Sequence, residues 1–94
     1  MYVRVVRFTD VTAERVDALL ARIEQSDAAP EGAPITGLQL LFDAAQGTAV
    51  VLQTFDTPED MRTGGEVFAA MDPSDTPGTR ASVDMCEVKL ERRR

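Results

Sequence analysis

Side chains able to perform acid–base or metal chemistry are few in this chain of 94 residues. It contains no histidine, which removes the commonest general base, the commonest metal ligand and any histidine-ligated haem. Its single cysteine, Cys86, excludes an internal disulfide. A lone cysteine is either a reactive thiol or a small buried hydrophobe, and we expect the second more often. No glycine-rich loop with a lysine is present, so phosphate chemistry is disfavoured.

Acidic residues dominate the charge of the chain. The net charge is −6, and the segment 43–75 contains seven acidic residues against one base, Arg62. These acids are spread along predicted helix faces and loops without the spacing of metal ligands, so we expect no metal site and no cofactor. An acidic chain with five aromatic residues is also poorly suited to bind RNA. The closing "ERRR" is more typical of a solvated terminus than of a nucleic-acid patch.

Arg4 is the basic residue whose position is most informative. It lies in Tyr2–Phe8, a segment rich in β-branched and aromatic residues that predicts a strand. Alternation along a strand places Arg4 on the same face as Val6. If helices cover that face, the guanidinium meets an anionic ligand group, extends to the end of the sheet, or pairs with an acid. The last two interpretations together are favoured over a ligand contact.

Two amphipathic helices must position these residues. The first follows Thr12, a plausible N-cap, and should end near residues 27–29, before Pro30. Its apolar residues recur at helical spacing: Val16, Leu19, Leu20 and Ile23. The second is predicted over 58–71, with Thr57 as its N-cap and a Gly64–Gly65 pair in its interior. We expect this glycine pair to allow close packing on a sheet rather than to form a hinge or a ligand contact.

The remaining apolar segments predict three further strands, at 38–43, 48–55 and 79–91, and residues 44–47 suit a hairpin with Gly47 at a positive φ. The resulting order is βαββαβ. Two right-handed crossovers then place both helices on one face of a four-stranded antiparallel sheet. The prediction is therefore a single α+β domain over 1–94 with a ferredoxin-like fold.

The face of the sheet that the helices leave uncovered predicts a homodimer. The runs "LQLLF" and "AVVL" are nearly continuous in apolar residues, as in strands buried on both faces. Two copies packed sheet against sheet would bury this face with two-fold symmetry. The last strand contributes alternate residues to the expected interface: Ser82, Asp84, Cys86, Val88 and Leu90. An ion pair across the interface is the expected role of Asp84.

Three stretches resemble a known group of proteins: "VVRFTDVTAERVDALLARI", "VVLQTFDTPEDM" and "EVFAAM". Together they make the chain resemble the dimeric α/β-barrel proteins, especially the antibiotic-biosynthesis monooxygenase-like group. The resemblance covers nearly the whole chain and rests on fold patterns rather than on a catalytic signature. In that group the ligand lies between the sheet and the helices of each subunit. The lining that the resemblance implies is Val6, Leu20, Ile23, Gln53, Phe55, Phe68 and Met71, with Arg4 beside it.

The chain departs from the enzymes of that group at three positions. Members that oxidise polycyclic phenols without a cofactor often have a tryptophan where this chain has Phe55, and an asparagine where it has Val6. Haem-degrading members use a histidine near the end of the second helix, where this chain has Met71 and Asp72. The resemblance therefore argues against haem oxygenation.

Two functions remain in balance. The first is an enzyme acting on a small apolar or aromatic compound, for example a cofactor-independent monooxygenase, which would need a base that the pocket does not obviously offer. The second is a non-catalytic ligand-binding or structural dimerisation module. No apolar run approaches ~18 residues, and the first eight residues are too short and charged for a signal peptide, so a cytoplasmic protein without membrane contact is expected.

Overall fold

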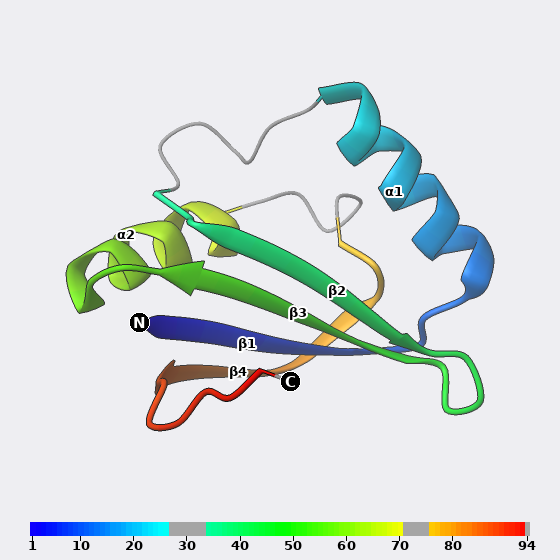
Figure 1. The fold of residues 1–94 in the computed structure, drawn as a ribbon. Helices are drawn as coiled ribbons and strands as arrows, with labels where there is room; N and C mark the ends of the chain where they lie inside the picture. Colours follow the sequence, from blue (N-terminus) through cyan, green and yellow to red (C-terminus); the bar gives the residue numbers. More distant parts are fainter. Residues whose placement is uncertain (27–33, 71–75, 94) are drawn as a thin grey trace.

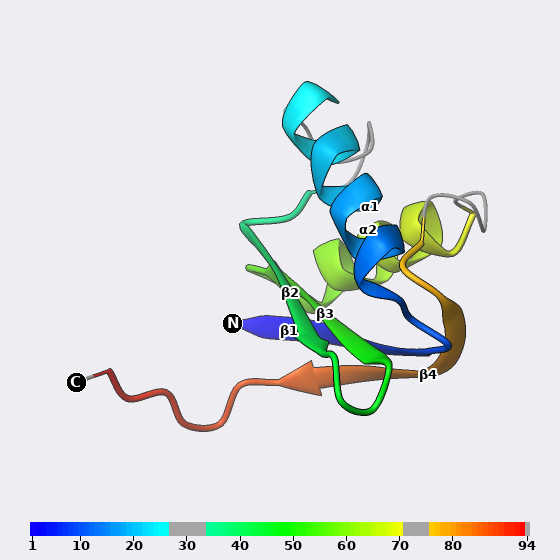
Figure 2. The ribbon, with the colours of Figure 1, turned by 90° about the vertical axis from the view of Figure 1, so that its right-hand side faces the viewer.

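A four-stranded antiparallel sheet with both helices on one side forms the molecule (Figure 1; Figure 2). The computed structural model describes residues 1–26, 34–70 and 76–93. The elements along the chain are β1 (Tyr2–Thr9), α1 (Ala13–Ser26), β2 (Gly37–Asp43), β3 (Thr48–Phe55), α2 (Pro58–Ala69) and β4 (Thr79–Glu87). The strands lie in the order β2-β3-β1-β4. The predicted ferredoxin-like βαββαβ fold is confirmed.

Strand register divides the side chains between a helix-facing side and an open side. In β1, Arg4, Val6 and Phe8 are buried toward the helices, whereas the residues between them are more exposed. Because cross-strand partners share a side, the register defines rows across the sheet. Two helix-facing rows are Leu38–Gln53–Arg4–Met85 and Leu40–Val51–Val6–Val83.

Both helices begin at the residues that the sequence predicts. The Thr57 hydroxyl accepts a hydrogen bond from the Asp60 backbone N–H at 3.0 Å, with Pro58 in the first turn. The Thr12 hydroxyl accepts one from the Arg15 backbone N–H at 3.2 Å. Each bond satisfies a donor that the first turn of a helix leaves unpaired. Helix α2 ends at Ala69, two residues before the predicted end, and the predicted end of α1 lies outside the described residues.

Helix α1 contacts the sheet mainly through its first turns. Val16 is buried among Val6, Phe8 and Ala49, whereas Leu20 and Ile23, one and two turns further on, are exposed. Both views show the later turns of α1 rising away from the sheet (Figure 1; Figure 2). The apolar stripe of this helix therefore packs against the sheet at Val16 but not at Leu20 and Ile23.

Strand β4 is shorter than predicted and is covered on neither side. The last residue pair between β1 and β4 is Tyr2–Glu87, and the Val88 backbone N–H still donates to the Met1 carbonyl at 3.0 Å. The strand ends at Glu87, so Val88 and Leu90 lie beyond it, against the prediction of a strand to 91. Every residue of β4 is exposed. Cys86 is consequently exposed in the single chain, so burial of its thiol would need a partner subunit.

The hydrophobic core is divided into two clusters. One consists of Val6, Phe8, Val11, Val16 and Ala49 beneath α1, and the other of Phe55, Met61 and Phe68 beneath α2. Arg4 and Gln53 occupy the row between Tyr2–Phe55 and Val6–Val51. A polar pair thus interrupts the core at the centre of the sheet.

Candidate ligand-binding site

The two central residues of the interrupted row are buried and bonded to each other. Arg4 is 3 % exposed and Gln53 is 4 % exposed. The Arg4 Nη1 donates a hydrogen bond to the Gln53 Oε1 at 2.8 Å. No Asp or Glu in the described part of the chain forms an ion pair with Arg4, since the ion pairs there join Lys89 to Glu87 and Arg93 to Glu91. The buried guanidinium is therefore held by a neutral amide.

Helix α2 covers the Arg4 side chain at two points. The guanidinium carbon lies 6.0 Å from the centroid of the Phe68 ring, at the limit of a cation–π contact. A Cβ placed on Gly65 would stand 3.4 Å from the Arg4 Nε and 3.4 Å from the Met85 Cε. The helix thus passes over the arginine, and Gly65 places no side chain of its own against the Nε.

Gly64 explains how α2 approaches the sheet so closely. A Cβ at this position would lie 2.3 Å from the Phe55 Cε1, a separation that real contacts do not reach. Phe55 is fully buried beneath it. The prediction that the glycine pair serves close packing is confirmed at Gly64, whereas Gly65 adjoins the polar row.

The surroundings of Arg4 oppose its positive charge. Burial lowers the pKa of Arg4, and repulsion from Arg80 lowers it further. Arg80 pairs with Phe8 in the sheet and so projects to the helix-facing side, as Arg4 does. Desolvation and a like charge both penalise the ionised form. Two arginines on one side of the sheet, one of them buried, create a positive potential that favours an anion.

The structure decides between the expectations for Arg4. The side chain is not extended to solvent at the end of the sheet, because it is 3 % exposed, and it has no acidic partner among the described residues. The expectation that the side chain extends to the end of the sheet is thus wrong, and the expected acidic partner is not among the described residues. The physical reason is that α2 covers the row from above, while the nearest polar atom across the sheet belongs to Gln53.

The predicted site residues separate into three groups. Arg4, Gln53 and Phe68 come together at the polar row, with Phe55 in the next row under α2. Val6 is buried in the cluster beneath α1. Leu20 and Ile23 are exposed and belong to neither cluster, and Met71 lies outside the described residues.

Sequence reasoning missed the two ends of the row. Leu38 on β2 is 44 % exposed and Met85 on β4 is 47 % exposed, although both are on the helix-facing side. The buried polar pair is therefore flanked by two apolar side chains that water reaches. The sequence shows that both are apolar residues of predicted strands. It does not show that they lie beside Arg4 and Gln53, because that depends on the register between strands far apart in the chain.

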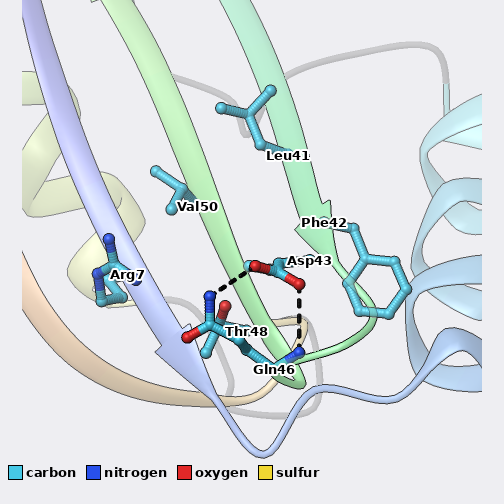
Figure 3. Close-up of a pocket in the computed structure, with 8 residues that line it drawn as sticks. Arg7, Leu41, Phe42, Asp43, Gln46, Thr48 and Val50 are labelled. Atoms are coloured by element: carbon cyan, nitrogen blue, oxygen red, sulfur yellow. Dashed lines mark hydrogen bonds between the residues drawn. The ribbon is translucent and has the colours of Figure 1, made fainter.

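A shallow hollow of about 250 Å³ lies elsewhere, on the open side at the β2–β3 hairpin (Figure 3). Arg7, Leu41, Asp43 and Val50 are among the residues that line it. The Asp43 carboxylate is occupied by the turn, since it accepts hydrogen bonds from the Gln46 side chain at 2.8 Å and backbone at 3.2 Å. None of the predicted ligand-binding residues lines this hollow.

A porphyrin iron held by histidine does not fit the residues present. The chain has no histidine, and of Met61, Gly64, Gly65 and Phe68, which α2 presents toward the sheet, only Met61 has an atom able to ligate iron. Among the described residues no group of three His, Cys, Asp or Glu side chains is placed to hold a metal ion. Within the same residues, no helix has the length and apolar character needed to cross a membrane.

Comparison with known proteins supports the fold. No model of a known protein family matches the chain, and no curated protein sequence does. Among solved structures, the chain is similar to a point mutant of MhuD crystallised with two manganese protoporphyrin IX molecules per active site. The match has 18% identity and a TM-score of 0.61, and it covers 98% of each chain. The match supports the predicted ferredoxin-like fold over nearly the whole chain.

Proposed function

We propose that this chain is a homodimeric α/β-barrel protein that binds a small apolar or aromatic molecule on the helix-facing side of its sheet. The observation that carries the proposal is the buried Arg4–Gln53 pair, flanked by exposed apolar side chains on both edge strands. A few convergent polar groups within an apolar surface are typical of small-molecule sites. We place Phe68 beside this pair, above the packed Val6 and Phe55, with Leu20 and Ile23 supplied by α1.

A ligand would contact apolar surface that is exposed to solvent in the ligand-free protein. Leu20 and Ile23 on α1 and Leu38 on the helix-facing side of β2 are exposed. Burying such side chains stabilises a complex by roughly 25 cal/mol for each Å² removed from water. An apolar molecule is therefore the occupant whose chemistry suits this surface.

Thermal shift measurements with a panel of aromatic compounds test the proposed binding. A true ligand at 100 times its Kd stabilises the protein by about 2.7 kcal/mol, which raises the Tm measurably. Polar compounds of matched size, such as monosaccharides, are the control and should leave the Tm unchanged. If no aromatic compound raises the Tm more than the sugars do, the protein is not a binder of this class.

The open side supports the proposed homodimer. It combines partly buried apolar residues on the central strands with opposite charges, Arg7 on β1 and Asp84 on β4. A two-fold axis lets two copies pair such charges reciprocally. Of the predicted interface residues, Ser82, Asp84 and Cys86 lie on this side, and Val88 and Leu90 lie beyond the strand.

Two substitutions of similarly exposed leucines test the dimer. Leu41 lies on the open side of β2, and Leu20 lies on α1. Leu41→Asp should give a monomer by light scattering, because it places charge at the interface, whereas Leu20→Asp should keep twice the chain mass. If the wild-type protein is a monomer at micromolar concentration, the proposed homodimer is wrong, whereas the proposed ligand site is unaffected by this result.

Cofactor-independent monooxygenation is the second candidate function, and the buried cation favours it. Oxygen reacts without a cofactor only with an electron-rich, deprotonated substrate, and an adjacent guanidinium lowers the pKa of a bound phenol. The substrate supplies all the electrons: one CH₂ group and O₂ give one C=O group and water. Oxygen uptake with a polycyclic phenol should then match ketone formed, and should fall in Arg4→Met. Uptake equal to that of the buffer alone would leave binding as the function.

A further inference from the structure

Among the described residues of the ligand-free protein, Arg4 has no counter-charge. The guanidinium is buried between two apolar clusters, and its described polar partner is the neutral Gln53 amide. Burying a charge without an opposite charge is unfavourable, and proteins normally neutralise it by pairing. The pKa of Arg4 is lowered by burial and by Arg80, which agrees with an uncompensated cation.

We infer that the bound molecule is an anion, a small aromatic or apolar compound whose carboxylate or phenolate oxygen pairs with Arg4. This inference rests on the proposed binding function and specifies the ligand class. A guanidinium presents a planar fork of donors that matches such oxygens, and ion pairs of this kind are stronger than neutral hydrogen bonds. The Arg4 side chain would fix the charged end, and the exposed apolar residues would contact the rest.

The β4 edge is the side from which the anion reaches Arg4. The Nη1 is directed to Gln53 on β3, whereas the Nε lies near Gly65 and Met85 on the opposite side. Met85 is exposed, and Gly65 places no side chain over this approach. Arg80 is exposed on the helix-facing side of β4, and its charge adds positive potential along this approach.

A purely structural role for Arg4 makes the opposite prediction about stability. If the hydrogen bond to Gln53 and the contact with Phe68 satisfy Arg4, any change of the pair destabilises the protein. If Arg4 is kept for an anion, an internal carboxylate should stabilise the ligand-free protein and compete with the ligand. In a variant with an internal carboxylate beside Arg4, the stability of the ligand-free protein should therefore rise while its affinity for the anion falls.

The variant Gln53→Glu tests this without a ligand. It places a carboxylate where Arg4 already donates, so at pH 7 we expect the Tm to rise by roughly 4 to 8 °C. Pairing with Arg4 lowers the pKa of this carboxyl below its ordinary value of about 4.3, so the gain should decline below about pH 4.3 and disappear as the pH falls through the lowered pKa. The double variant Arg4→Met/Gln53→Leu, which removes the charge and its partner together, should also be at least as stable as the wild type. A lower Tm at pH 7 in both variants overturns the inference.

Two matched probes test the charge preference directly. 2-Naphthoate and 2-naphthamide share a ring and differ in charge, and titration should show about 10- to 100-fold tighter binding of the acid. The ratio should fall to about one in Arg4→Met and in Gln53→Glu, and remain unchanged in Arg62→Met, which alters an exposed arginine of α2. Equal affinity of the two probes for the wild type overturns the inference and leaves the proposed binding intact. Failure of both probes and of the wider aromatic panel counts against the proposed function, while the Tm of Gln53→Glu still decides whether Arg4 lacks a counter-charge.

Discussion

The two helices cover the same side of the sheet but pack on it differently. Helix α2 lies close to β1 and β3, with Gly64 against the ring of Phe55 and with Met61 and Phe68 buried. Helix α1 buries Val16 and leaves Leu20 and the next apolar turn exposed. One half of this side is closely packed, and the other half is only partly covered.

This difference assigns different roles to the two helices. The closely packed half fixes the polar row, because α2 holds Arg4 from above and Gln53 holds it from β3. A site that depends on ionic geometry needs such rigid support. The later turns of α1 bury little surface, so in the proposed complex they would contact the apolar part of the ligand. Measurements that compare matched residues in the two halves test this division.

The largest expected contrast is between two phenylalanines. Phe55 is 0 % exposed beneath α2, and Phe42 is 36 % exposed on the helix-facing side of β2. Phe55→Ala should lower the free energy of unfolding by about 3–5 kcal/mol, because it leaves a cavity in packed surroundings. Phe42→Ala should cost about 1–2 kcal/mol, because much of its ring already meets water. Urea denaturation at one fixed protein concentration measures both, and equal losses would show that the two halves are packed alike.

The two adjacent glycines of α2 give the next contrast. Gly64→Ala should destabilise by about 1–3 kcal/mol, since its Cβ would overlap the buried ring of Phe55. Gly65→Ala should be neutral or stabilise by up to about 1 kcal/mol, because alanine favours a helix and its Cβ would meet only side-chain atoms of Arg4 and Met85 at 3.4 Å or more. Denaturation of both variants measures the difference. A larger loss at Gly65 than at Gly64 would contradict the packing described for α2.

Sequence reasoning located the elements but only part of the site. Periodicity and capping residues identified all the strands and helices, because these signals are local in the chain. The register of β2 on β3 also follows from a short hairpin, in which Asp43 pairs with Thr48. The pairing of Arg4 with Gln53 joins residues 49 apart, and no turn sets it. It follows from packing of the whole sheet, so the buried pair was not predicted.

The position of α1 was unpredictable for a different reason. Helical spacing shows which face of α1 is apolar, and it correctly placed Val16 toward the sheet. Spacing carries no information on the distance between each turn of the helix and the sheet. The resemblance implied that Leu20 and Ile23 line a ligand cavity, and in the ligand-free protein both side chains are exposed.

The helix caps give a smaller contrast. Thr57→Ala and Thr12→Ala each remove a hydroxyl that accepts from the first turn, a change worth about 1 kcal/mol. We expect the full loss in the global stability only for Thr57, because α2 is integral to the core. For Thr12 we expect faster hydrogen exchange confined to α1 with a smaller global loss. Thr57→Ser and Thr12→Ser keep the oxygen and serve as controls. A global loss at Thr12 as large as at Thr57 would mean that α1 unfolds only together with the sheet.

The smallest effect on stability should come from Leu20, the exposed apolar residue in the middle of α1. Leu20→Ala should change the free energy of unfolding of the ligand-free protein by about 0.5 kcal/mol or less, as for other surface substitutions. If α1 closes on the apolar part of a ligand, the same variant should weaken 2-naphthoate binding several-fold, because contact surface is lost only in the complex. Leu90→Ala, at an exposed residue beyond β4, should change neither quantity. A loss of several kcal/mol in the ligand-free protein would instead place Leu20 in a packed core, and the contrast between the two helices would then disappear.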